Sequence, residues 1–311
     1  MKLSQLRDFI AMAKASSIRA AARELGLAQP ALTRSLRDLE QEMGVSLVER
    51  QATGIVLTDA GTRFLPRAQA AMEELRRGSE EAMQNAGSMK GAVSVGLSSA
   101  ALLGLMPTAY ADFRKACPQI RLRVVEGVFQ ILEPRLRNGM LDFHVGPRPP
   151  QLPSNYQVDL LFRNDRCVMG RKNHPLRLAG TIKTLREAPW IVTGLHERIE
   201  EEFEEVFSAI GLQAPASVTQ VDSMLAVLVL LTTTDSLVIL PRQWADSPLF
   251  ADQLEAIPVR EPLAAPDIVQ ITRTGLPLTP AAELLSTLLR RAQSQLPRPP
   301  RQRTTRAAKA S

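Results

Sequence analysis

Cysteine is scarce in this chain. Of its 311 residues only two are cysteines, Cys117 and Cys167, and neither belongs to a CxxC pair or has a histidine at ligand spacing. Disulfide frameworks and zinc sites need more such residues at closer spacing. We therefore expect both cysteines to be reduced structural thiols, and we expect no metal and no other cofactor.

Long apolar runs are missing as well. No window holds the roughly 18 uncharged apolar residues that a membrane span requires. Lys2, Arg7 and Asp8 place charges where a signal peptide needs an apolar run. The sequence therefore predicts a cytoplasmic protein with no membrane partner. A hydrophobic content of 45% instead allows two domains with real cores, at about 150 residues per domain.

The chain also lacks grouped acid, base and nucleophile residues. Its histidines, His144, His174 and His196, are scattered, and it contains neither a GxSxG motif nor a Gly-rich phosphate loop. His174 lies in a His-Pro-Leu turn and is interpreted as structural. The glutamates of residues 200–205 share a predicted helix with apolar residues, which favours a solvated helix face over a metal site. We therefore do not expect an enzyme.

Acidic residues are absent from the end of the chain. The formal net charge is +6, but seven basic residues and no acidic residue follow residue 289, so residues 1–289 carry a net charge of −1. A nearly neutral body gives no general attraction to nucleic acid. Any DNA binding has to be inferred from local patterning.

Hydrophobic periodicity predicts three short helices before residue 44. The first begins at Leu3, the second is rich in alanine and ends at Gly26, and the third begins near Pro30, whose missing N–H has no helical partner there. The third helix buries a stripe of Leu32, Leu36, Leu39 and Met43. Its opposite, basic and polar face consists of Pro30, Thr33, Arg34, Arg37 and Gln41.

A helix-turn-helix inserts such a face into the major groove, where Arg pairs with guanine and Gln or Thr reaches other base edges. A solvated charged face is the alternative interpretation of Arg34 and Arg37. Residues 45–50 and 55–57 then flank a Gly-containing turn, which indicates a two-stranded wing. We expect the wing tip and Arg50 to lie near the phosphate backbone, where contacts supply affinity and register.

Residues 17–25 (SIRAAAREL), 29–34 (QPALTR) and 57–61 (LTDAG) resemble the signature of LysR-type transcriptional regulators in order and spacing. The resemblance implies a winged helix-turn-helix that binds double-stranded promoter DNA and a tetramer built as a dimer of dimers, and it leaves a contact with RNA polymerase open. Ala28 departs from the family, which usually has a capping Ser there. The candidate DNA-binding residues are Ser17, Arg19, Gln29, Pro30, Ala31, Thr33, Arg34, Arg37, Arg50 and Thr53.

A long linker helix is predicted over residues 59–90, with Thr58 as its N-cap and Pro66 bending it locally. Spacings of four and three alternate in a weakly apolar heptad seam that favours dimerisation. An amphipathic helix that lies on its own domain is the alternative. The seam consists of Gly61, Leu65, Ala68, Met72, Leu75, Ser79, Ala82 and Ala86. Gly87 and Gly91 flank an expected hinge.

From residue 91 onward, short apolar runs alternate with helical patterns, as in βα units on a mostly parallel sheet. Strands are predicted at residues 93–97, 120–126, 142–146, 190–193, 218–221, 237–241 and 268–273, and helices at 102–114, 130–138, 198–210, 223–231 and 280–292. Together with residues 139–143 (GMLDF) and 174–176 (HPL), the pattern resembles the LysR effector domain, which is similar to periplasmic solute-binding proteins. The resemblance implies an α/β domain, residues 91–296, with lobe one at 91–162 and 268–296 and lobe two at 163–267. A ligand cleft is expected at the strand ends.

Ser98, Ser99 and Ala100 follow the first strand of lobe one and begin a helix, so free N–H groups and two hydroxyls are expected to face the cleft. These groups favour a small organic effector with an anionic group, whereas helix capping alone is the alternative role of the serines. Phe129 is expected to form an apolar wall that favours a compact organic acid. The resemblance adds the candidates Val128, Phe129, His144, Val145, Gly146, Thr193, Gly194, Ser223 and Pro241.

These patterns favour an effector-responsive transcription factor. A solute receptor whose N-terminal part mediates protein contacts is one alternative, and the missing signal peptide and the outward Arg34 and Arg37 weigh against it. An enzyme of unknown type is the other, which the lack of grouped catalytic residues disfavours.

The tail, residues 297–311, is rich in Pro, Arg and small residues and is expected to be disordered, with at most a non-specific attraction for DNA. Deletion of residues 298–311 should leave the melting temperature of the chain unchanged. Thermal unfolding of the two chains checks this, and a decrease of several degrees would refute it.

Overall fold

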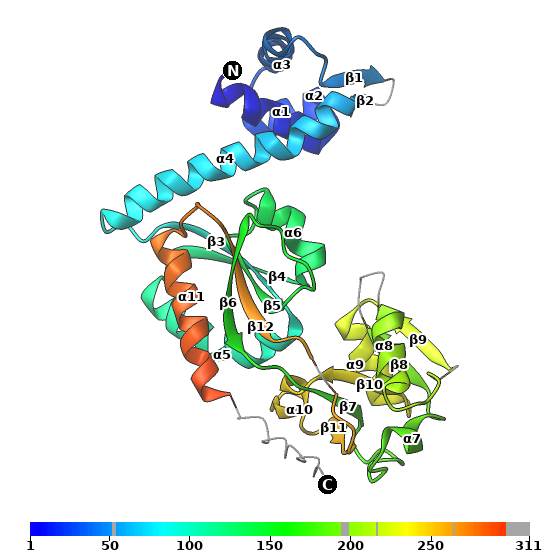
Figure 1. The fold of residues 1–311 in the computed structure, drawn as a ribbon. Helices are drawn as coiled ribbons and strands as arrows, with labels where there is room; N and C mark the ends of the chain where they lie inside the picture. Colours follow the sequence, from blue (N-terminus) through cyan, green and yellow to red (C-terminus); the bar gives the residue numbers. More distant parts are fainter. Residues whose placement is uncertain (52–53, 194–198, 216, 264, 297–311) are drawn as a thin grey trace, which may run out of the picture.

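The computed structural model describes residues 1–51, 54–193, 199–215, 217–263 and 265–296. A winged head, a long helix and two α/β lobes follow one another along the chain (Figure 1). Thr53, Gly194 and the tail, residues 297–311, lie outside the described residues, so the expectations for them stay predictions.

The head consists of α1 (Leu3–Ala15), α2 (Ile18–Leu25), α3 (Gln29–Met43) and the antiparallel strands β1 (Val48–Gln51) and β2 (Gly54–Leu57). Leu32, Leu36 and Leu39 of the predicted stripe are buried against α1 and α2, and Met43 is half-buried. Leu32 and Leu39 are fully inaccessible, in the same core as Phe9 and Met12. Apolar burial therefore fixes which face of α3 remains outside.

Polar contacts fix the position of α3 further. The buried Asp8 of α1 accepts a hydrogen bond from the Ser35 hydroxyl at 2.6 Å. At the other end, Glu40 accepts hydrogen bonds from the N–H groups of Leu47 and Val48 at 2.7 and 3.2 Å, at the start of the wing. Helix and wing are therefore held in one geometry, because the carboxylates would lose these partners if either element moved.

Helix α4 (Asp59–Asn85) begins at Thr58, whose side chain accepts a hydrogen bond from the Gly61 N–H at 3.0 Å. Its first half packs on α1, where the Phe64 and Phe9 ring centroids lie 5.6 Å apart and Ala68 is buried. Of the predicted seam, the C-terminal members Leu75, Ser79, Ala82 and Ala86 are exposed. Only the first half of the seam therefore lies on its own domain.

The second half of α4 contacts lobe one through polar side chains. Arg77 is buried and forms an ion pair with Asp142, whose Oδ1 lies 2.9 Å from the Arg77 Nε. Asp142 also accepts a hydrogen bond from the Ser94 N–H at 2.7 Å, and Arg77 donates to the carbonyl oxygens of Gly139 and Leu141. Buried charges, not apolar side chains, thus join α4 to lobe one.

The turn at residues 86–90 is tied back to this contact. The Gln84 side chain donates to the Lys90 carbonyl at 3.0 Å and accepts from the Ala281 N–H at 2.9 Å. Gly91 has a φ of +126°, and the Glu80 carboxylate fills the space that a Cβ at Gly91 would need. The expected hinge at residues 87–91 is therefore a hydrogen-bonded turn in this structure.

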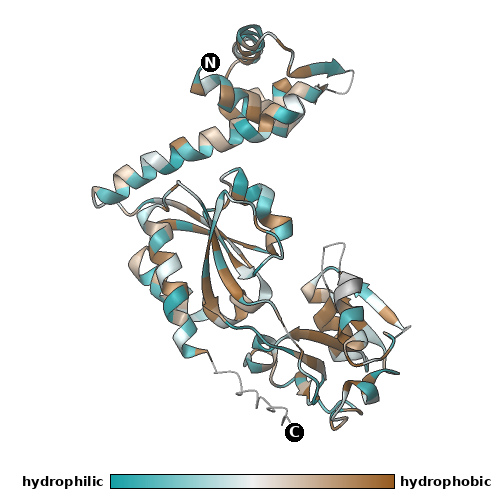
Figure 2. Cartoon of the chain, in the orientation of Figure 1, coloured by the Kyte–Doolittle hydropathy of each residue, from teal (hydrophilic) through white to brown (hydrophobic). Residues whose placement is uncertain are grey.

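Lobe one has a five-stranded sheet of order β4-β3-β5-β12-β6. Its strands are β3 (Gly91–Leu97), β4 (Ile120–Glu126), β5 (Phe143–Pro147), β6 (Tyr156–Phe162) and β12 (Ile268–Arg273), and its helices are α5 (Ser99–Ala116), α6 (Phe129–Arg137) and α11 (Pro280–Ala292). Strands β4, β3 and β5 are parallel, and β12 runs antiparallel to both of its neighbours. The apolar strands lie between helices whose outer faces are polar (Figure 2).

Lobe two has a second sheet of order β11-β7-β10-β8-β9. Its strands are β7 (Arg166–Arg171), β8 (Trp190–Thr193), β9 (Val218–Val221), β10 (Leu237–Pro241) and β11 (Leu254–Ile257), and its helices are α7 (Ile182–Leu185), α8 (Ile199–Ser208), α9 (Met224–Thr233) and α10 (Gln243–Asp246). The chain crosses between the lobes after β6 and again before β12. Two crossing segments of this kind are typical of hinged, two-lobed binding domains.

Three strands, β6, β7 and β11, were not expected from the sequence.

His174, which was interpreted as structural, is 1% exposed. Its ring nitrogens contact the Asp235 carbonyl oxygen and the Leu176 N–H, each at 3.0 Å.

The N-terminus of α3 generates a stability prediction. Ala28 has the extended backbone of an N-cap but no side chain that can cap. Ala28→Ser should stabilise the first turn by about 1 kcal/mol because the hydroxyl can accept a backbone N–H. That gain corresponds to roughly fivefold slower amide hydrogen exchange in the first turn of α3. Ala31→Ser, which places the hydroxyl inside the exposed helix face, is the matched control and should give no gain; equal exchange in both variants would contradict the prediction.

Candidate functional site

The outer face of α3 and the wing meet in a shallow depression on the head. The depression is lined by Gln29, Pro30, Thr33, Arg34, Arg37, Asp38 and Arg50. Six of these seven were predicted as DNA-binding residues, and the fold brings the phosphate-contact candidate Arg50 beside the base-reading candidates of α3. One surface therefore combines a helix face and a strand end.

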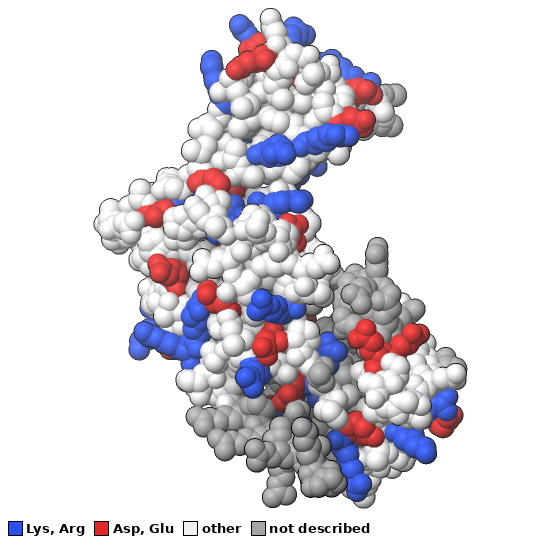
Figure 3. All heavy atoms as spheres, viewed as in Figure 1, with Lys and Arg blue, Asp and Glu red and all other residues white. Residues whose placement is uncertain are grey.

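The arginines of this depression are accessible. The Arg34 side chain is 85% exposed, and its contact with Asp38, at 4.0 Å, is at the limit of an ion pair. Arg37 and Arg50 are also exposed. Basic and acidic side chains alternate over the face of the head seen in Figure 3, so the positive charge is local rather than spread over the head.

The other DNA-binding candidates lie outside the depression. Ser17 caps α2 by accepting a hydrogen bond from the Ala20 N–H, and it is half-buried. Arg19 is exposed on the first turn of α2, and Ala31 is exposed on α3. Ser17 and Arg19 therefore lie at the start of α2, apart from the residues that line the depression.

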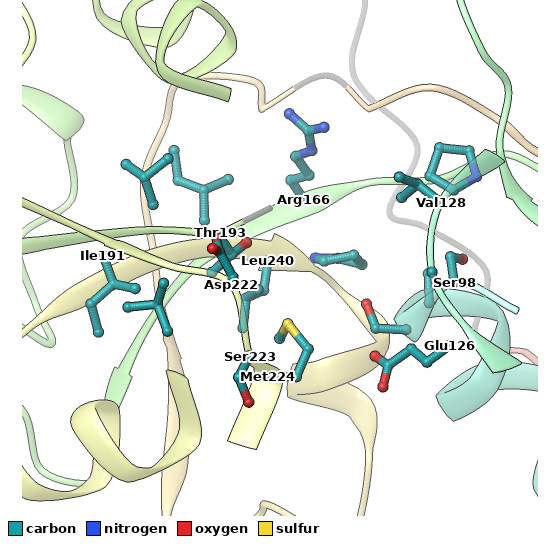
Figure 4. Close-up of a pocket in the computed structure, with 18 of the residues that line it drawn as sticks. Ser98, Glu126, Val128, Arg166, Ile191, Thr193, Asp222, Ser223, Met224 and Leu240 are labelled. Atoms are coloured by element: carbon teal, nitrogen blue, oxygen red, sulfur yellow. The ribbon is translucent and has the colours of Figure 1, made fainter. Parts of the chain in front are cut away.

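A cavity of about 560 Å³ lies between the two lobes. Lobe one contributes the residues after β3 and β4, and lobe two contributes the ends of β8, β9 and β10, as Figure 4 shows for the labelled residues. The lining consists of Ser98, Ser99, Ala100, Glu126, Gly127, Val128, Ile131, Pro147, Asn164, Arg166, Ile191, Val192, Thr193, Phe203, Val206, Val221, Asp222, Ser223, Met224, Leu225, Ile239, Leu240, Pro241 and Pro266. Its volume is within the range of small-molecule sites.

Seven predicted effector residues line this cavity: Ser98, Ser99, Ala100, Val128, Thr193, Ser223 and Pro241. Four others do not. Phe129 is 4% exposed and packs edge-on against Tyr156 inside lobe one, with ring centroids 5.3 Å apart, so it is not the expected apolar wall. His144, Val145 and Gly146 lie within β5, in the interior of the sheet behind Ser98.

His144 has no access to solvent. Its Nε2 lies 3.1 Å from the Gly127 carbonyl oxygen, whereas its Nδ1 has no hydrogen-bond partner among the described residues. Burial lowers the pKa of His144 to about 4, against a smaller opposing effect of the Gly127 hydrogen bond. The imidazole is therefore neutral near pH 7, with the proton on Nε2.

Three helix N-termini face the cavity, those of α5, α6 and α9. Ser98 and Ser223 cap α5 and α9 by accepting backbone N–H groups, whereas Val128 gives α6 no side-chain cap. The remaining first-turn N–H groups have no intrahelical partner and carry partial positive charge. Capping by the serines and a positive cavity wall thus coexist.

Four charged or amide residues of the lining were missed: Glu126, Asn164, Arg166 and Asp222. Glu126 ends a predicted strand and Asp222 follows another, so the rule that ligands bind at the carboxyl ends of strands could have found both. Asn164 and Arg166 precede or begin β7, which the sequence pattern did not predict. The described residues hold no cluster of three metal-ligating side chains.

The fold and these two surfaces define a winged helix-turn-helix regulator with a two-lobed substrate-binding domain. The lysR family of bacterial regulatory helix-turn-helix proteins matches residues 3–62, and the LysR substrate binding domain matches residues 86–294. The chain belongs to the LysR family of DNA-binding transcriptional regulators, which are not enzymes.

Relatives extend over most of the chain. It is 27% identical to the HTH-type transcriptional regulator GalR of Pseudomonas putida over 288 residues, 92% of this chain and 72% of the relative. It is 30% identical to the HTH-type transcriptional regulator PcaQ of Agrobacterium fabrum over 217 residues, 69% of this chain and 70% of that relative.

Solved structures share the fold. Superposition on CbnR, a LysR family transcriptional regulator, gives a TM-score of 0.70 at 21% identity and covers 94% of this chain and 99% of that one. Full-length CbnR complexed with its target DNA gives a TM-score of 0.69 at 22% identity, covering 94% of this chain and 100% of that one. The predicted architecture, a winged head, a linker helix and a two-lobed α/β domain, is confirmed. None of the described helices has the length and apolar character of a membrane span.

The buried His144 generates a pH prediction. Because its pKa is about 4 in the folded chain and about 6.5 in an unfolded one, it stabilises the fold above pH 6.5. This contribution, about 3 kcal/mol, is lost as the pH falls from 6.5 towards 4. The melting temperature should therefore fall more steeply over that range in the native chain than in His144→Gln, whose amide can still donate to Gly127. Parallel pH profiles would contradict the lowered pKa.

Proposed function

We propose that the chain is a sequence-specific DNA-binding regulator whose activity is controlled by a small organic effector with an acid group, bound between the two lobes. The observation that carries the proposal is the presence, in one chain, of a basic recognition-helix surface and an inter-lobe cavity lined by three helix N-termini. The family membership supports the DNA-binding half, and the cavity supports the effector half.

In the DNA complex, α3 lies in the major groove. Arg34 and Arg37 read base edges with Gln29 and Thr33, because they share the exposed face of the helix. Arg50 binds the phosphate backbone beside them, since it lies at the end of the wing strand and not on the helix. Arg19 on α2 is placed for a further phosphate contact.

In the effector complex, the acid group lies at the N-termini of α5, α6 and α9, where unpaired N–H groups and helix dipoles favour an anion. Arg166 adds a positive side chain to the same cavity. The apolar body of the effector packs against lobe two, where Val206, Ile239 and Met224 supply the wall that was expected from Phe129. A cavity of about 560 Å³ suits a compact ligand.

The chain self-associates through α4. Leu75 and Met83 are 50% and 44% exposed on this helix, and Leu75 belongs to the part of the heptad seam that no other described residue covers. Pairing with α4 of a second copy would bury these side chains, which gives a dimer and, by the family resemblance, a tetramer built from two dimers.

The two arginine roles give a paired prediction. Arg34→Ala should weaken binding to the specific site by about 1–3 kcal/mol and relax the preference at one base pair per half-site. Arg50→Ala should weaken binding to all sequences alike and reduce the salt dependence of binding, because a phosphate contact releases counterions whatever the base. Binding isotherms at several salt concentrations, on DNA upstream of the gene for this chain and on scrambled DNA, separate the two. An unchanged sequence preference in Arg34→Ala, or an unchanged salt slope in Arg50→Ala, would contradict the assignment.

The effector half is tested at Ser99. This residue is the first of α5 and its hydroxyl makes no hydrogen bond with a described residue, so Ser99→Ala should leave the fold intact while weakening binding of an organic acid. Titration of the full chain with a panel of cellular organic acids identifies the acid, and the variant is then compared with Thr108→Ala on the far side of α5. Equal affinities in all three chains would show that the acid binds elsewhere.

A further inference from the structure

Two carboxylates lie on opposite walls of the inter-lobe cavity. Glu126 is the last residue of β4 in lobe one, and Asp222 directly follows β9 in lobe two. Figure 4 shows Glu126 beside Ser98 on one side of the cavity and Asp222 beside Thr193 on the other. Both side chains are exposed to solvent. Neither carboxylate makes a hydrogen bond or ion pair with any described residue, so both are open to a ligand in the cavity.

Asn164 supplies a third hydrogen-bond acceptor to the cavity. Asn164, in the first crossing segment, lines the same cavity and is 6% exposed, and its Oδ1 has no hydrogen-bond partner among the described residues. Buried amide oxygens are normally paired, because an unpaired one costs about 1–3 kcal/mol. An acceptor of this kind at a ligand cavity calls for a donor on the ligand.

The charges of the lining residues also favour a ligand that carries a positively charged group. Among the described lining residues, Arg166 is the one basic side chain, against Glu126 and Asp222. A ligand with only an acid group would add a negative charge to a cavity that already holds two. The three helix N-termini can hold an acid group, but nothing in the described lining compensates both carboxylates.

Closure of the cleft would strengthen the repulsion between the carboxylates of Glu126 and Asp222. Because the carboxylates come from different lobes, any closure of the cleft brings two like charges together and removes water from between them. Only a cationic donor between them reverses the sign of that interaction. Closure would therefore be opposed without such a group and favoured with it.

We propose that the effector is zwitterionic: a protonated amino group binds between Glu126 and Asp222 and donates to the Asn164 side chain, while its acid group binds at the helix N-termini. This inference rests on the proposed effector site and adds the second charged group that the site requires. The chemical class is a compact amino acid with an apolar side chain, because the lobe-two wall around Val206 and Ile239 is apolar.

Titration of the full chain with matched ligands tests the proposal. The probes are the twenty common L-amino acids, the carboxylic acids that lack only the amino group, and the amines that lack only the carboxylate, each followed by calorimetry. At least one amino acid is expected to bind ten times or more tightly than both of its truncated partners. Calcium and magnesium chloride form a separate arm, since two carboxylates and an amide oxygen could also hold a metal ion.

Variants connect the preference to the two carboxylates. Glu126→Gln and Asp222→Asn should each reduce the preference for the amino acid over its deaminated partner to less than threefold, without weakening binding of the deaminated acid. Asp112→Asn, which changes an exposed acid of α5 outside the cavity, is the matched control and should retain the full preference.

Each remaining outcome counts against a defined part of the account. If deaminated acids bind as well as the amino acids, or if the two variants keep the preference, the zwitterion inference is wrong and the acid-binding site stands. Binding of calcium or magnesium that requires both carboxylates overturns it as well. If neither acids nor amino acids bind, the inter-lobe effector site itself is wrong, and this inference with it.

Discussion

The ion pair between Arg77 and Asp142 is the contact on which the arrangement of the whole chain depends. It is the centre of a buried polar network that joins α4 to lobe one, and α4 in turn is packed on the winged head. Burial raises the pKa of Asp142, and the attraction of Arg77 offsets this only in part. Removal of one partner from a buried pair leaves an unpaired charge, at a cost of about 3–5 kcal/mol. The pair is thus less important for its net stability than for the geometry that it specifies.

The contact of α4 with lobe one means that the two lobes are attached to the head differently. The head, α4 and lobe one form a continuous series of packed contacts, and β3 follows α4 after a turn that Gln84 and Glu80 bind back to the helix. Among the described residues, lobe two is joined to lobe one by the two crossing segments and by contacts such as that of α10 with α5. A change in cleft width would therefore displace lobe two relative to the DNA-binding surface, while lobe one stays with the head. In the proposed function, the effector acts through that displacement.

The sequence predicted the parts of this arrangement that depend on periodicity and failed where long-range contacts decide. The stripe of α3, the wing and seven strands follow from residue patterns, and five of the predicted strand ranges agree with the structure at both ends. Strand β7 escaped because charged residues begin and end it and Gly170 interrupts it, so Asn164 and Arg166 were missed with it. Phe129 was expected in the cleft from the family resemblance. The structure instead packs it against Tyr156, because the first turn of α6 rotates its side chain into the core. No local pattern indicated that Arg77, Glu80 and Gln84 would be buried, since their partners are distant in the sequence.

The central claim, that buried charges fix the DNA-binding head to lobe one, can be tested by measuring the distance between spin labels on these two parts. Arg23→Cys on α2 and Gln130→Cys on α6 provide exposed labelling sites. The native Cys117 and Cys167 are buried. Labelled chains are diluted with unlabelled chains, so that only distances within one chain are measured. The account predicts one narrow distance distribution, a broad one after Arg77→Gln, and no change after Arg63→Gln at an exposed position of the same helix. A distribution that is broad in the native chain, or equally narrow after Arg77→Gln in a folded protein, would contradict it.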